Sequence, residues 1–119
     1  MTTTAVILGT TVAGQPSGNY DGSSQDWVGS PHMGADYYRG HGGLQTITFS
    51  VTNFVGRMVL EATLDADGNT ATWFETAVYQ SDISYTDRHP VTVSGNFTWV
   101  RVRVELFDAG TIDTVTITY

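Results

Sequence analysis

Strict alternation of apolar and polar side chains is clearest in residues 45–53, QTITFSVTN. Ile47, Phe49 and Val51 occupy every second position, and serine or threonine lies between them. Successive side chains of a β-strand point to opposite faces, so a period of two predicts a strand with one face in the core and the other in water.

A second strand is predicted over residues 57–66, RMVLEATLDA, after a short corner at residues 54–56. Its expected core face comprises Met58, Leu60, Ala62 and Leu64. Its expected outer face includes Arg57, Glu61, Thr63 and Asp65. The turn cluster DADGNTA separates this strand from TWFETAVYQ, which predicts a hairpin over residues 57–80 with a loop longer than two residues. The polar segment from Gln80 to Pro90 predicts a crossing loop.

The most regular alternation lies in residues 97–107, FTWVRVRVELF, between the two further predicted strands PVTVSG and TVTITY. The expected inward side chains are Val100, Val102, Val104 and Leu106. The expected outward side chains are Trp99, Arg101, Arg103, Glu105 and Phe107. This pattern predicts a strand with a continuous aliphatic face.

The fold class follows from several strands with polar outer faces, regular turns and no helical crossover. Nineteen threonines and thirteen glycines favour strands and turns over helices, so we expect almost no helix. The chain of 119 residues is about one domain long. We therefore predict a single all-β domain over residues 1–119, an antiparallel two-sheet β-sandwich of jelly-roll type, with its main strands in residues 44–119.

Residues 10–43 differ from the rest because they are rich in Gly, Ser and Asp and show no alternation. A stretch this long without regular structure is commonly functional or held in place by contacts. Its aromatic residues Tyr20, Trp27, Tyr37 and Tyr38 argue against disorder. We expect an extended arm or loop that packs on the sandwich or on a neighbouring molecule.

Charge and composition exclude several classes of binding partner. The formal net charge is -7 and lysine is absent, so the chain offers no basic surface for nucleic acid or for an anionic membrane. Cysteine is also absent, which excludes disulfides and thiolate chemistry. The N-terminal stretch lacks the positive charge and the apolar length of a signal peptide, so no export signal is expected.

One short acidic segment resembles part of a calcium-binding loop. Asp65, Asp67 and Asn69 have suitable spacing, but Thr70 replaces the required glycine and Thr76 replaces the required bidentate acid. An acidic hairpin turn is the favoured interpretation, with calcium as the alternative. No cofactor is predicted.

Candidate catalytic residues do not form a recognisable motif. The three histidines, His32, His41 and His89, lack the close spacing of a zinc site, and no G-x-S-x-G sequence is present. The three glutamates, Glu61, Glu75 and Glu105, lie on or near strands. Outward-facing acids of this kind are normally solvated or paired, here with Arg101 or Arg103, so we predict a protein that is not an enzyme.

Exposed aromatic side chains are the remaining candidates for recognition. The residues that could stack on sugars are Trp27, Tyr37, Tyr38, Trp73 and Trp99. Large aromatics also supply much of the binding energy of protein interfaces. A protein interface is the favoured interpretation, and a glycan site is the alternative.

Two segments resemble a known group of proteins. The segment DYYRGHGGLQTITFSVTNFVGRMVLEATLDADGNTATWFE, followed later by VTVSGNFTWVRVRVELFDAGTI, is similar to small virion structural proteins of tailed bacteriophages, especially T4-like phages of marine cyanobacteria. The resemblance covers residues 36–112, about two thirds of the chain. It rests on the phrases NFVG and GNFTWVRV in this order.

The resemblance implies a β-sandwich building block of a virion, assembled in the host cytoplasm, and it implies no catalytic residue. Its partners would be other virion proteins and copies of itself, in the head, neck, baseplate or fibre attachment. We predict that the contacts involve Trp27, Tyr37, Tyr38, Arg39, His41, Trp73 and Trp99. The alternative function is that of a carbohydrate-binding module.

Overall fold

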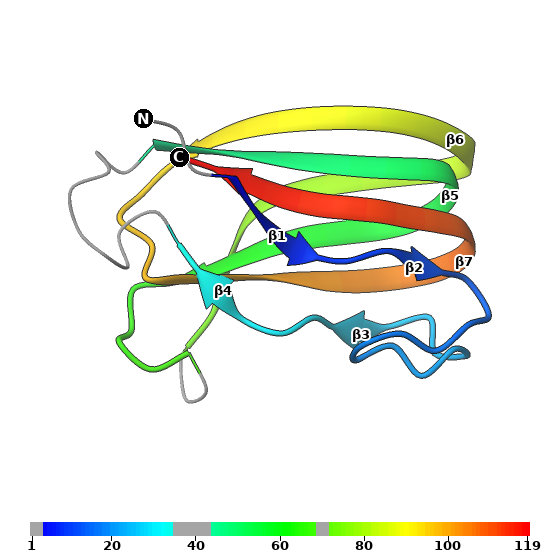
Figure 1. Cartoon of the computed structure of the whole chain (residues 1–119), viewed down its shortest axis with the longest axis horizontal. Helices are drawn as coiled ribbons and strands as arrows, with labels where there is room; N and C mark the ends of the chain where they lie inside the picture. The colour runs from blue at the N-terminus through cyan, green and yellow to red at the C-terminus, as the bar shows by residue number, and fades with distance from the viewer. Residues whose placement is uncertain (1–3, 35–43, 69–71) are drawn as a thin grey trace.

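The computed structural model describes residues 4–34, 44–68 and 72–119. These residues form seven β-strands in one antiparallel sheet (Figure 1). The strands are β1 (Thr4–Leu8), β2 (Thr11–Val12), β3 (Trp27–Val28), β4 (His32–Met33), β5 (Leu44–Thr63), β6 (Phe74–Ser94) and β7 (Trp99–Thr118). The described part of the chain contains no helix, which confirms the all-β prediction and leaves no helical segment that could cross a membrane.

The three long strands lie side by side in the order β7, β5, β6, and each bends near its middle (Figure 1). The bend brings the two halves of the sheet face to face, with the apolar core between them. Tyr79 in the first half of β6 stacks on Phe49 in the first half of β5, with ring centroids 5.8 Å apart. Tyr79 also contacts His89 in the second half of its own strand at 5.4 Å. Because β5 pairs antiparallel with both β6 and β7, the predicted antiparallel arrangement is confirmed. The finer prediction of a two-sheet sandwich or jelly roll is not confirmed.

Unusual backbone conformations produce the bend. Asn53 in β5 and Leu106 and Gly110 in β7 all have positive φ angles, of 51°, 53° and 88°. The register between β5 and β7 shifts on both sides of Val55, as expected where extra residues bulge out of a ladder. A Cβ atom at Gly110 would lie 2.1 Å from the Asn53 carbonyl oxygen, so only glycine allows the two strands to approach this closely.

The predicted hairpin over residues 57–80 is confirmed, because Arg57 pairs with Gln80 and Ala62 with Phe74. The predicted loop from Gln80 to Pro90 is wrong, because these residues lie within β6. β6 lies at the edge of the sheet and is mostly exposed on both faces. A strand in this position needs few apolar side chains, and its sequence therefore shows little alternation.

The core contains most of the side chains that alternation assigned to it. Ile47 and Phe49 are fully buried and Val51 is 1% exposed, and Met58, Leu60 and Ala62 are also fully buried. Leu64 is the exception, with 63% of its surface exposed. It lies one residue beyond the end of β5, where the alternation of the strand no longer orients side chains.

In β7, the predicted directions of the neighbouring side chains Leu106 and Phe107 are wrong. Val100, Val102 and Val104 are fully buried as predicted, but Leu106 is 54% exposed and Phe107 only 4%. The left-handed conformation of Leu106 interrupts the alternation and exchanges the two faces. The structure also joins two segments that were predicted as separate strands. FTWVRVRVELF and TVTITY lie mostly within the single strand β7, Trp99–Thr118.

The N-terminal segment runs antiparallel along the outer edge of β7 (Figure 1). β1 and β2 pair with the second half of β7, and β3 and β4 pair with its first half. Residues 13–26 connect the two pairs across the bend, where the Asp26 carboxylate accepts a 3.0 Å hydrogen bond from the Leu106 amide. Residues 10–34, predicted to lack regular structure, thus contain the three short strands β2, β3 and β4, which pair with β7.

Candidate functional site

Trp27, predicted as a contact residue, is instead part of the core. It is 8% exposed, and its ring lies 5.2 Å from that of Tyr20 and 6.4 Å from that of Phe107. Pairing between β3 and the first half of β7 turns this side chain inward. The prediction that it is available on the surface was wrong, because the irregular arm gave no alternation from which its direction could be determined.

Four of the other predicted contact residues, Tyr37, Tyr38, Arg39 and His41, lie outside the described residues. Their role stays a prediction.

Trp73 and Trp99 both contact their own chain. The Arg101 guanidinium carbon lies 4.3 Å from the centroid of the Trp73 ring, in a cation–π arrangement. The Trp99 indole Nε1 donates a 3.0 Å hydrogen bond to the Ala66 carbonyl, and its ring covers Gly68. Arg101 thus covers one face of the Trp73 ring, and the Trp99 ring is held against residues 66–68.

The predicted calcium candidate forms part of a turn. The Asp65 carboxylate accepts a 2.8 Å hydrogen bond from the Thr72 amide, and its own amide donates to the Thr63 hydroxyl at 3.1 Å. Asn69 lies outside the described residues. Within residues 4–34, 44–68 and 72–119, no three His, Cys, Asp or Glu side chains are grouped so that they could hold a metal ion.

The outer face formed by residues 57–63, 74–81 and 99–105 carries a network of charged side chains, which we call the ion-pair face. Its members are Arg57, Glu61, Glu75, Arg101, Arg103 and Glu105. Glu61 accepts from Arg101 Nε at 2.8 Å and from Arg103 Nη1 at 2.6 Å. Arg57 Nη1 donates to Glu105 at 2.6 Å, and Arg103 also contacts Glu75. The predicted pairing of these glutamates with arginines is confirmed.

The ion-pair face is electrically balanced, since it contains three arginines and three glutamates. The Glu61 side chain is only 6% exposed because Arg101 and Arg103 lie over it. A hydrogen bond with Glu75, together with the charges of Glu61 and Glu105, raises the pKa of Arg103 above its ordinary value. These groups already satisfy one another, so the face is neither an anion site nor a pair of free carboxylates for acid–base chemistry.

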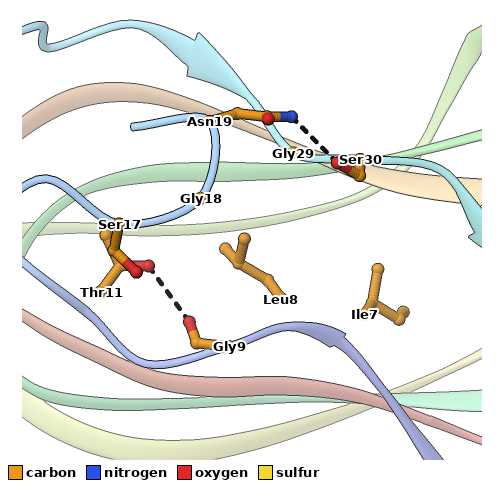
Figure 2. A pocket seen from close by; sticks show the side chains of 9 residues that line it. All are labelled: Ile7, Leu8, Gly9, Thr11, Ser17, Gly18, Asn19, Gly29 and Ser30. Atoms are coloured by element: carbon orange, nitrogen blue, oxygen red, sulfur yellow. Dashed lines mark hydrogen bonds between the residues drawn. The ribbon is translucent and has the colours of Figure 1, made fainter. Parts of the chain in front are cut away.

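A cavity of about 230 Å³ lies between the N-terminal strands and the loop that follows them (Figure 2). Its polar groups bond to one another: the Asn19 amide donates to the Ser30 hydroxyl, and the Thr11 hydroxyl donates to the Gly9 carbonyl, both at 3.1 Å. No ionisable or aromatic side chain lines this cavity. Its hydrogen bonds hold the N-terminal segment in place.

Exposed apolar side chains are concentrated on β6 and at the bend. On β6, Phe74 and Val78 are each 42% exposed, Tyr85 is 51% exposed and Ile83 is 72% exposed. Leu106 on β7 adds a further exposed side chain at the bend. Sequence reasoning missed this surface because Ile83 and Tyr85 were assigned to a polar loop and Leu106 to the core.

The free side of β6 is poorly suited to accept another long strand. Within the described residues β6 pairs only with β5, so its outer backbone groups have no neighbouring strand. However, Thr76 bulges out between Glu75 and Ala77, and the register shifts again between Ser81 and Tyr85. Pro90 further lacks an amide donor. Bulges and proline are devices that prevent edge-to-edge pairing.

Comparison with known proteins places no further constraint on the site. The chain matches no family model, no curated protein and no solved structure.

Proposed function

We propose that the protein is a non-enzymatic structural subunit of a tailed-phage virion that acts through protein–protein contacts. The sequence resemblance over residues 36–112 supports the assignment to a virion. The exposed apolar side chains of the surface support action through protein–protein contacts. The carrying observation is that four of the exposed large apolar side chains lie on the single edge strand β6: Phe74, Val78, Ile83 and Tyr85.

Burial of such side chains is the main favourable term in protein association. Exposed apolar side chains commonly contribute to contact surfaces, and four of them follow one another along this edge strand. Because bulges and Pro90 interrupt the edge of β6, the contact uses side chains rather than addition of a strand. The subunit therefore docks as a folded unit.

The remaining charge pattern agrees with such a role. A net charge of -7 keeps free subunits apart by mutual repulsion until a specific contact forms. The ion-pair face contributes nothing to this excess, because its charges balance.

The experiment that tests the function is quantitative peptide mass spectrometry on purified phage particles from the source. A fixed number of copies per particle supports the structural role, and that number distinguishes head from tail positions. Absence from particles, together with binding in a glycan screen, would contradict the proposal and support the carbohydrate-binding alternative.

A pair of variants tests the contact surface. Ile83→Asp places a charge on the exposed side of β6 and should reduce incorporation into particles severalfold. Val6→Asp is the matched control, because Val6 is 52% exposed on β1, on the opposite edge of the sheet. Equal incorporation of both variants would show that β6 is not a contact surface.

A further inference from the structure

We infer that the bend of the sheet is a docking site for a partner protein that inserts an apolar side chain flanked by lysine or arginine. This inference rests on the proposed function, because it specifies the partner of a subunit that acts through protein contacts. The site, here called the bend corner, comprises Leu106, Asp108 and Asp82.

Leu106 is the residue that points to a partner. Its φ of 53° lies in the left-handed region, which glycine and asparagine adopt much more readily than leucine. Its side chain is 54% exposed, so burial in the core does not compensate for the strained backbone. The surrounding fold holds the strain in place, since the Asp26 carboxylate accepts the Leu106 amide and the Gln25 carbonyl accepts the Phe107 amide, both at 3.0 Å. A strained residue that displays an apolar side chain to water is explained by a contact made outside the chain.

A small cavity adjoins Leu106. It has a volume of about 120 Å³ and lies between Ser81 and Asp82 of β6 and Leu106 and Asp108 of β7, over the bend at Val55. The corner thus combines the exposed apolar side chain of Leu106 with a hollow of about the size of one side chain, lined by residues of two strands.

Charge determines which partner fits. The cavity is lined by two aspartates and by no cationic side chain. Asp82 accepts a hydrogen bond from the side-chain amide of Gln80, and Asp108 contacts the side-chain amide of Gln25, so these hydrogen-bond partners are neutral. Arg57, which directly follows the lining residue Gly56, is ion-paired with Glu105.

The described part of the chain leaves little positive charge for a second copy to supply. The chain has no lysine, and Arg57, Arg101 and Arg103 are ion-paired within it. The other described arginine, Arg88, lines a hollow together with Asp87 and Asp113. Two acidic corners would repel each other, so the occupant is a different protein with basic residues beside its apolar anchor.

The test uses the full chain and a defined probe. Binding of the peptide acetyl-Lys-Leu-Lys-Leu-Lys-amide is followed through the backbone amide NMR shifts of the ¹⁵N-labelled protein. The matched control peptide has glutamate in place of each lysine. The test variant is Leu106→Asn, which removes the apolar anchor but tolerates the left-handed backbone.

The basic peptide should shift the amides of residues 80–83 and 105–108, and the acidic peptide should not. Leu106→Asn should weaken binding about tenfold, which corresponds to about 1.4 kcal/mol. Asp82→Asn combined with Asp108→Asn should weaken binding and reduce its salt dependence. The inference is overturned if the basic peptide leaves these amides unshifted, or if Leu106→Asn binds it as the unaltered protein does.

Analytical sedimentation of the protein alone tests whether a second copy of the chain is the occupant of the bend corner. Concentration-dependent dimerisation that Leu106→Asn abolishes would mean that a second copy fills the corner, and it would overturn the inference. Particle mass spectrometry is independent of both measurements. Absence from particles with intact peptide binding refutes only the virion role, whereas incorporation without peptide binding refutes only the basic partner.

Discussion

The ion-pair face and the bend corner expose their side chains on the same sheet in opposite ways. On the ion-pair face, each charged side chain meets a counter-charge on another strand, as Glu61 does with Arg101 and Arg103. At the bend corner, Leu106 is strained and exposed, and the cavity beside it holds carboxylates without cations. The charges of the ion-pair face are balanced within one chain. The apolar side chain and the carboxylates of the bend corner are matched only in a complex.

The largest expected effect comes from breaking the bend itself. Gly110→Ala would place a Cβ atom 2.1 Å from the Asn53 carbonyl at a φ of 88°. We expect the free energy of unfolding to fall by about 2 to 6 kcal/mol, since left-handed strain and overpacking each contribute about 1 to 3 kcal/mol. Urea unfolding measures the change. Gly9→Ala, where nothing lies within 4 Å of the added atom, is the control and should have little effect.

The second effect concerns the centre of the ion-pair face. Glu61→Gln leaves Arg101 and Arg103 without the buried charge that they share, and should lower the free energy of unfolding by about 1 to 3 kcal/mol. Glu75→Gln is the matched control, because Glu75 is 49% exposed, and should change it by at most about 1 kcal/mol. Equal losses in urea unfolding would show that burial of Glu61 is unimportant.

A smaller effect of opposite sign is expected at the bend corner. Leu106→Gly relieves the left-handed backbone and should raise the free energy of unfolding by up to about 1 kcal/mol. Thermal unfolding would show the gain as a higher melting temperature. A variant that is less stable than the unaltered protein would mean that the exposed side chain of Leu106 stabilises the fold, which contradicts its assignment to an outside contact.

The last effect appears only at high pH and concerns Tyr79 in the core. Burial and the neighbouring Asp87 raise the pKa of Tyr79 from 10.0 to about 12. Between these pH values the unfolded chain loses the proton and the folded chain keeps it, so stability should fall as the pH rises. Tyr79→Phe should remove this part of the decline in alkaline urea unfolding. An unchanged decline in the variant would assign it to other groups.

Alternation predicted the core-facing side chains of β5 correctly, and Ile47 to Val51 are the clear case because the residues between them are partly exposed. From Met58 to Thr63 both faces are buried, so alternation in the sequence does not correspond to alternation in burial there. Outward alternation also anticipated the pairing of Glu61 with arginine. It failed at Leu106, since no pattern of polarity encodes a leucine with positive φ. It also failed between Gln80 and Pro90, because an edge strand exposed on both faces resembles a loop. One sheet bent at residues 53–56 and two separate sheets give the same pattern of strands and corners.

The bend corner could not be predicted from the alternation of polar and apolar residues either. It depends on an exchange of faces at Leu106 and on the approach of Asp82 to Asp108, which lie far apart in the chain. Trp27 illustrates the converse, since an aperiodic arm hides a core residue among polar neighbours.

The position of β7 has a consequence for the order of folding. β7 is the last strand along the chain, yet both β5 and all four N-terminal strands pair with it. Thr4 and Thr118, which are 114 positions apart, meet through their hydroxyl groups. During synthesis the β5–β6 hairpin can form early, whereas the N-terminal segment has no strand to pair with until β7 emerges. Contacts at such separation make folding slow, on the order of milliseconds to seconds, and the N-terminal strands stay available to solvent and chaperones for that interval.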